Sequence, residues 1–305
     1  MTHTRITIVG NDGIASLLQP WCALFRRQHA QVDFALTLKG SSTAIMALAA
    51  DACQLAPMSR APWAQELAAF HKVKGYAPSA IRLGYCGYGP RTGAKTPPAI
   101  YAHCSNPLPG LTMGQLAAVF SSGAPQGDIT CWRQLGIEGG WQSRRIHLYG
   151  LRDDGKYASA FRRAHLANRF FPRHYEALPD RRTVIEAVAN DPFGLGATGW
   201  FDAAAVSSQV RVVALTRREQ GPFYPPSLQA VGAGNYPLAG ELALWFDLPP
   251  GGRLAPPIKA FLQLALSDAG QAVIAQQTDS AEGYVALDAD SLGREREKLS
   301  GLQAD

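Results

Sequence analysis

The segment from Arg5 to Leu38, RITIVGNDGIASLLQPWCALFRRQHAQVDFALTL, sets the class of fold. It opens with an apolar, β-branched run, turns at GND, and continues with apolar residues at helical spacing before a second strand-like run, VDFALTL. The chain then passes through KGSS into the helical pattern TAIMALAA, and CQLAPMSR leads into APWAQELAAF. This βαβα order predicts an α/β fold in which mostly parallel sheets are flanked by helices.

Composition narrows the class of protein. The 305-residue chain is 47% hydrophobic and 17% charged, with a net charge of +5. Such a chain can form one or two substantial cores and is too apolar to be disordered. This mild positive excess suits an anionic ligand, but the basic residues are dispersed, which argues against nucleic-acid binding. No apolar run approaches the roughly 20 residues that span a bilayer, and no secretory signal opens the chain, although a signal removed by processing would leave the same sequence.

Two stretches without helical periodicity, near residues 84–104 and 234–247, indicate that the chain crosses twice between two domains. We therefore expect a discontinuous first lobe, residues 1–88 and 238–305, and an inserted second lobe, residues 89–237. Within the second lobe, Thr112 is the expected N-cap of the helix that LTMGQLAAVF forms.

Three turns place small or polar residues where a predicted helix begins: GNDGIA at 10–15, KGSSTA at 39–44 and RDDGKY at 152–157. A helix N-terminus presents free N–H groups and a partial positive charge, and Ser, Thr or Asn side chains add further donors. Each turn alone is weak evidence, because Ser42 or Thr43 taken alone is better explained as an ordinary helix cap. Because ligands of open α/β folds bind at the carboxyl ends of strands, the three turns together indicate an anion site.

The sequence gives little support to catalysis. It lacks GxSxG, HExxH and GxxxxGK[ST], and its seven histidines show no metal-ligand spacing. The neighbouring carboxylates Asp153 and Asp154 are better explained as charges that stabilise a helix start than as a metal site. We therefore expect no enzyme, no metal and no cofactor.

Five cysteines are widely spaced and form no CxxC pair. We expect buried free thiols, with a bridge between Cys86 and Cys104 as the alternative.

Several segments resemble the phosphate-binding proteins of high-affinity phosphate ABC importers. They include GSSTAI and APMSR near the N-terminus, NPLPGLTMGQLAAVFSSG in the middle, and YPLAGELALWFDLPPG near the C-terminus, in the order expected for that family. The resemblance implies a type II periplasmic binding protein fold with a ligand cleft between two lobes, a periplasmic or secreted location, and a monomer that closes on phosphate by hinge motion. It also implies transporter membrane subunits as partners and no nucleic acid.

The resemblance also implies a set of ligand-binding residues in the first lobe. The GSS turn is intact, so Ser42, with Ser41 and Thr43, is expected to donate to the anion; Ser59 of APMSR is expected nearby, with Arg60 beside it. The first turn differs from the family, because it has three residues where relatives commonly have Ser and Thr hydroxyls. These residues are Asn11, Asp12 and Gly13.

The middle turn differs further. It retains Gly155, but Asp154 and Lys156 stand where the family has two hydroxyls, and Arg152 and Lys156 would compensate the ligand's charge. A carboxylate accepts but cannot donate a hydrogen bond, so Asp12, Asp153 or Asp154 would favour a ligand that still carries a proton. The alternative is that these carboxylates cap helices and pair with Arg152 or Lys156.

The favoured hypothesis is a solute-binding protein for a small oxyanion, phosphate first, that delivers it to an ABC importer. Two alternatives stay open: the same fold binding another anion for sensing or secretion, and a scaffold whose pocket no longer binds ligand.

Overall fold

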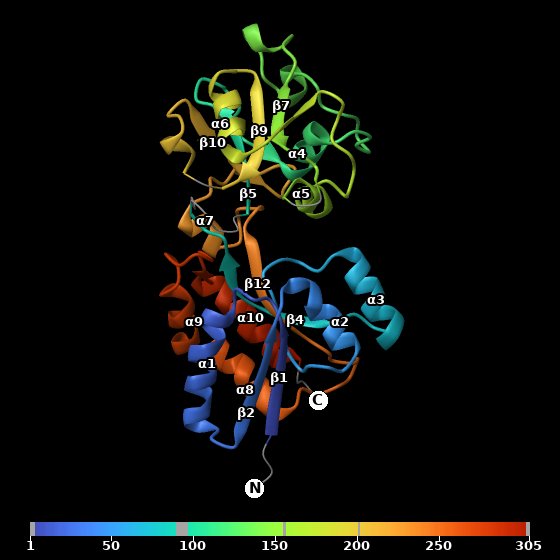
Figure 1. Ribbon diagram of the computed structural model, residues 1–305, viewed down its shortest axis with the longest axis vertical. Helices are drawn as coiled ribbons and strands as arrows, with labels where there is room; N and C mark the ends of the chain where they lie inside the picture. Colours follow the sequence, from blue (N-terminus) through green and yellow to red (C-terminus); the bar gives the residue numbers. More distant parts are fainter. Residues whose placement is uncertain (1–3, 90–96, 155–156, 201, 303–305) are drawn as a thin grey trace. The chain divides into compact units, whose positions relative to one another are not determined.

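The computed structural model describes residues 4–89, 97–154, 157–200 and 202–302. The chain divides into two compact units: Met1–Gly87 with Gly240–Asp305, and Tyr88–Ala239. Each is an α/β unit (Figure 1).

The described residues of unit 1 form six strands: β1 Thr4–Gly10, β2 Val32–Leu38, β3 Ala56–Met58, β4 Ser79–Cys86, β12 Gly240–Phe246 and β13 Val285–Ala286. Its α-helices are α1 Ala15–Gln28, α2 Ala44–Ala49, α3 Ala64–Lys74, α8 Pro256–Ala265, α9 Asp268–Ala275 and α10 Ala289–Gly301, and the 3₁₀ turn η1 spans Ser41–Thr43.

The parallel part of unit 1 positions the turns that follow its strands. β1 pairs with β2 in parallel from Thr4↔Val32 to Gly10↔Leu38, and a parallel bridge joins Ile8 to Leu55, just before β3. The carboxyl ends of β1, β2 and β3 therefore meet at one edge. β3 also pairs with β12, in the strand order β13-β4-β12-β3, and all the pairs in this set are antiparallel. The strands of unit 1 are therefore mixed rather than parallel throughout.

The apolar periodicity of the opening segment explains how α1 packs. Leu17, Trp21 and Phe25 recur at helical spacing and are buried, and Ile6 and Ile8 of β1 are buried as well. The Trp21 Nε1 donates to the Gly270 carbonyl at 3.1 Å, which ties α1 to α9 across the sequence. Burying each large side chain stabilises the unit by roughly 1.5–3 kcal/mol.

In unit 2, the part of the chain that the structure describes forms seven strands: β5 Pro98–His103, β6 Leu111–Thr112, β7 His147–Leu151, β8 Tyr175–Leu178, β9 Gly194–Gly199, β10 Val210–Val212 and β11 Leu215–Thr216. Its α-helices are α4 Met113–Phe120, α5 Tyr157–His165, α6 Arg181–Ala189 and α7 Leu228–Gly232, with 3₁₀ turns η2 Trp132–Leu135, η3 Gly139–Trp141 and η4 Ala203–Ala205.

The main sheet of unit 2 has the order β10-β5-β9-β7-β8. β7 is parallel to β8 and β9, whereas β5 is antiparallel to both β9 and β10. Figure 1 shows α6 beside β9, where Val184 and Val188 pack against Gly196. Thr112 caps α4 as predicted, because its hydroxyl oxygen accepts from the Gln115 amide at 3.0 Å.

The cysteines are free thiols, so the alternative bridge between Cys86 and Cys104 is not formed. Cys22, Cys53 and Cys86 are buried; Cys104 and Cys131 are not, contrary to the expectation that all five are buried. Among the described residues, no helix is both long and apolar enough to cross a membrane. In the same residues, no three His, Cys, Asp or Glu side chains are grouped to hold a metal ion.

Candidate functional site

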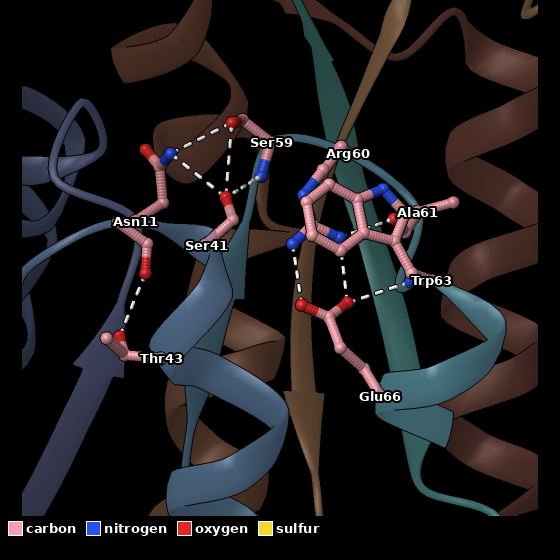
Figure 2. Close-up of polar contacts among 9 residues, drawn as sticks. Asn11, Ser41, Thr43, Ser59, Arg60, Ala61, Trp63 and Glu66 are labelled. Carbon is pink, nitrogen blue, oxygen red and sulfur yellow. Dashed lines mark hydrogen bonds and ion pairs between the residues drawn. The ribbon is translucent and has the colours of Figure 1, made fainter. Parts of the chain in front are cut away.

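Three polar side chains meet where β1, β2 and β3 end (Figure 2). The Asn11 Nδ2 donates to the Ser41 hydroxyl oxygen at 3.1 Å and to the Ser59 hydroxyl oxygen at 2.8 Å. The two hydroxyl oxygens lie 3.4 Å apart, and the Ser59 amide donates to the Ser41 hydroxyl oxygen at 3.3 Å. We call Asn11, Ser41 and Ser59 the Asn–Ser cluster. The structure thus brings together one residue from each of three predicted site segments.

The backbone of the first turn holds Asn11 in place. Its amide donates to the Pro57 carbonyl at 2.9 Å, which extends the pairing of β1 with β3 by one residue. Its side-chain Oδ1 accepts from the Ile14 amide at 3.1 Å, just before α1 begins. With only 7% of its surface exposed, Asn11 is a buried polar residue whose amide group is fully hydrogen-bonded.

The second turn depends on Gly40, whose φ of 108° is disfavoured for residues with a side chain. The Thr43 hydroxyl and amide both donate to the Gly40 carbonyl, at 2.8 and 3.1 Å. Both donors of Thr43 therefore stabilise the turn, and neither is left for a ligand in this arrangement. Ser42, in the middle of the turn, is exposed.

The remaining residues of the first turn lie at the surface. Asp12 is exposed, and Gly13 is half-buried against the carboxylate of Glu282. A Cβ added to Gly13 would lie only 2.6–2.9 Å from that carboxyl group, so the glycine permits the close approach. Sequence reasoning missed Glu282, because nothing in the residues around it signals contact with a turn so far away in the chain.

Arg60 follows the Asn–Ser cluster but is engaged elsewhere (Figure 2). Its guanidinium donates to both carboxylate oxygens of Glu66, at 2.8 and 2.6 Å, and lies 3.8 Å from the centre of the Trp63 ring. The guanidinium of Arg60 also donates a hydrogen bond to the Ala61 carbonyl oxygen at 3.0 Å. These contacts fold the segment between β3 and α3 into a tight turn and leave the charge of Arg60 compensated.

The pKa of Glu66 reflects this pairing. Burial alone would raise it, but hydrogen bonds from Arg60 and from the Trp63 amide stabilise the carboxylate and bring the pKa below its ordinary value.

The middle turn follows β7 in unit 2. The carboxylate of Asp153 accepts from the Ser159 hydroxyl at 2.6 Å and pairs with the Arg162 Nε at 2.7 Å. Asp153 therefore stabilises the start of α5, and among the described residues its cationic partner is Arg162. Arg152 and Asp154 are exposed. The predicted site residues Gly155 and Lys156 lie outside the described residues.

Comparison with known proteins identifies the family of the chain. A family model described as a PBP superfamily domain matches residues 2–269. The chain is 31% identical over 289 residues to the phosphate-binding protein PstS from two strains of Pseudomonas aeruginosa, and the match covers 93% of this chain and 84% of the relative.

Solved structures show the same fold. PstS from Borrelia burgdorferi matches with a TM-score of 0.62 at 14% identity, over 94% of this chain and all of that one. A possible phosphate-binding protein from Planctomyces limnophilus matches with a TM-score of 0.54 at 16% identity, over the whole of both chains. The predicted α/β fold class and the resemblance read from the motifs are both confirmed. The chain belongs to the PBP superfamily and, within it, to the family of the phosphate-binding protein PstS.

Proposed function

We propose that this protein captures inorganic phosphate and delivers it to an ABC importer. The observation that carries the proposal is the Asn–Ser cluster, which lies at the carboxyl edge of β1, β2 and β3 in a chain 31% identical to PstS. Capture and release without chemistry is the role expected of a solute-binding protein rather than an enzyme. We place it in the periplasm or outside the cell and expect a monomer.

In unit 1, the proposed ligand donors are the hydroxyls of Ser41, Ser42 and Ser59. A hydrogen bond to a charged group contributes roughly 1.5–3 kcal/mol, so a few such donors account for tight binding of an oxyanion. The backbone amide of Gly13, at the start of the α1 turn, is a further candidate donor.

A carboxylate near the anion would discriminate phosphate from sulfate, because only phosphate keeps a proton to donate at neutral pH. Asp12 and Glu282 are the candidates in unit 1, since Glu282 lies directly against Gly13. A carboxylate would repel a fully deprotonated competitor that offers it no hydrogen.

In unit 2, the proposed contribution comes from the middle turn. Arg152 and Lys156 would compensate the ligand's charge, Gly155 would permit close approach of the backbone, and Asp154 would remain at the edge of the site. The engagement of Asp153 by Ser159 and Arg162 supports leaving that carboxylate out of the ligand set.

Isothermal titration calorimetry of the full chain tests the proposal. We expect saturable heat with phosphate at one site and none with sulfate at the same concentration. Binding of sulfate alone, or of neither anion, would overturn it and favour another ligand or a non-binding scaffold.

A further inference from the structure

We infer that Asn11 is a positioning residue that forces the Ser41 and Ser59 hydroxyls to donate toward the ligand. The inference rests on the proposed function, since it assigns how the same site is prepared for an oxyanion. It changes the expected role of Asn11, which acts through the two serines instead of contacting the anion itself.

The orientation of the Asn11 amide follows from its neighbours. The Ile14 backbone N–H can only donate, so the side-chain atom that faces it at 3.1 Å must be the oxygen, Oδ1. The NH₂ group then faces the two serines, because the oxygen and nitrogen of the planar amide diverge from the same carbon. A flipped amide would set the NH₂ against the Ile14 N–H and leave both buried donors without an acceptor.

The NH₂ group has two hydrogens, and each has one acceptor. One bonds the Ser41 hydroxyl oxygen at 3.1 Å and the other the Ser59 hydroxyl oxygen at 2.8 Å. Neither serine can donate to Asn11, because the nitrogen of an amide does not accept hydrogen bonds.

Ser41 is constrained further. Its hydroxyl oxygen accepts from the Asn11 Nδ2 and from the Ser59 amide, so both of its lone pairs are used. Its one remaining capacity is to donate its own hydrogen, either weakly to Ser59 at 3.4 Å or to a bound ligand. The cluster therefore presents donors, and the ligand that fits it is an acceptor such as an oxyanion.

Replacing Asn11 with Asp tests this polarity at nearly constant shape. The carboxylate accepts from both serines and turns their hydrogens away from the ligand, whereas Asn11→Ala merely frees the hydroxyls to rotate. We expect phosphate affinity to fall about 10-fold in Asn11→Ala and at least 100-fold in Asn11→Asp. If Asn11 only fills space, Asn11→Asp should lose only the affinity that repulsion by its added charge accounts for, and that loss should not depend on the Ser59 hydroxyl.

A double-mutant cycle with Ser59→Ala separates hydroxyl polarity from plain charge repulsion. If Asn11 acts through the serine, Asn11→Asp costs at least 10-fold less affinity in the Ser59→Ala background than in wild type. Equal costs in the two backgrounds would overturn the inference. Should Asn11→Asp fail to fold, the same cycle with Asn11→Ala decides, and again non-additive losses support the inference while additive losses contradict it.

A double-mutant cycle of Asn11 and Ser59, measured by thermal unfolding without ligand, tests this inference separately from the proposed function. Coupled shifts in melting temperature for the Asn11 and Ser59 substitutions would support the hydrogen-bond network, whether or not the wild-type protein binds phosphate. Absence of phosphate binding by the wild-type protein would count against the proposed ligand alone. Independent shifts would overturn the role of Asn11 whichever anion binds.

Discussion

The guanidinium of Arg60 and the carboxylate of Glu66 face each other through two parallel hydrogen bonds, 2.8 and 2.6 Å long, within one turn of chain. The bidentate geometry gives this ion pair both strength and direction. It fixes the path of the backbone immediately after Ser59. Arg60 therefore supports the backbone beside the candidate site through its ion pair with Glu66.

Glu66→Gln removes the ion pair with Arg60 and, with it, one reason why the stability of the folded protein falls at low pH. Because the folded-state pKa of Glu66 is lowered, the stability it contributes is present above its unfolded pKa of about 4.3 and is lost as pH falls through the folded value. We expect the variant to be about 1 kcal/mol less stable at pH 7 and closer to wild type at pH 3, as measured by urea unfolding. The exposed Glu138→Gln serves as the control; a deficit for Glu66→Gln that stays the same at both pH values would contradict this account.

Gly10→Ala tests the close approach of β1 to β3. A Cβ at Gly10 would lie 2.3 Å from the Pro57 carbonyl oxygen, so the strands must separate. Overpacking of this kind costs roughly 1–3 kcal/mol and would displace Asn11 from Ser59. Thermal unfolding should show a clear loss of stability, with Gly140→Ala, where no atom lies within 4 Å of the added carbon, unchanged. Equal melting temperatures for the two variants would show that β1 and β3 can separate without loss of stability, contrary to this account.

The thiols should divide by reactivity. Burial is the main reason that the pKa of Cys22 and of Cys53 rises to about 11 and that of Cys86 to about 12, so little reactive thiolate forms in the folded protein at pH 8. Alkylation followed by mass spectrometry should label Cys104 and Cys131 in native protein and the other three only after denaturation. Rapid native labelling of Cys86 would contradict the buried environment.

Arg152→Ala tests the contribution of the middle turn. If its guanidinium compensates the ligand's charge, phosphate affinity should fall about 10-fold, a loss of roughly 1.4 kcal/mol. Arg173→Ala changes the net charge equally at another exposed arginine of unit 2 and should leave affinity unchanged. Calorimetry at one ionic strength compares them, and a similar small loss in both would reduce the role of Arg152 to long-range attraction.

Local sequence patterns predicted the strand–turn–helix segments that hold Asn11, Ser41 and Ser59, because parallel strands bring successive turns to one edge. The cap at Thr112 was also predictable, because it depends on only four consecutive residues. Contacts between distant segments were not: Glu282 reaches Gly13 only through the tertiary fold, and the antiparallel pairing of β12 depends on the direction in which the chain returns.

Side-chain choices within one segment were also beyond the sequence. Asp153 directly follows Arg152 in the chain, yet its carboxylate pairs with Arg162, which the helical phase of α5 carries toward it. The sequence placed Arg60 beside the expected anion site, but its guanidinium pairs with the carboxylate of Glu66, six residues away. For each of these charged side chains the sequence offers more than one oppositely charged partner, and the geometry of the backbone selects one of them.

The most direct test of the central claim is a calorimetric titration of phosphate into wild-type protein and into the Ser41→Ala/Ser59→Ala double variant. Loss of two donors to a charged ligand, at roughly 1.5 kcal/mol each, predicts saturable binding by wild type and affinity at least 100-fold weaker in the variant. Wild-type affinity in a folded double variant would contradict the assignment of the Asn–Ser cluster as the phosphate-binding element of unit 1.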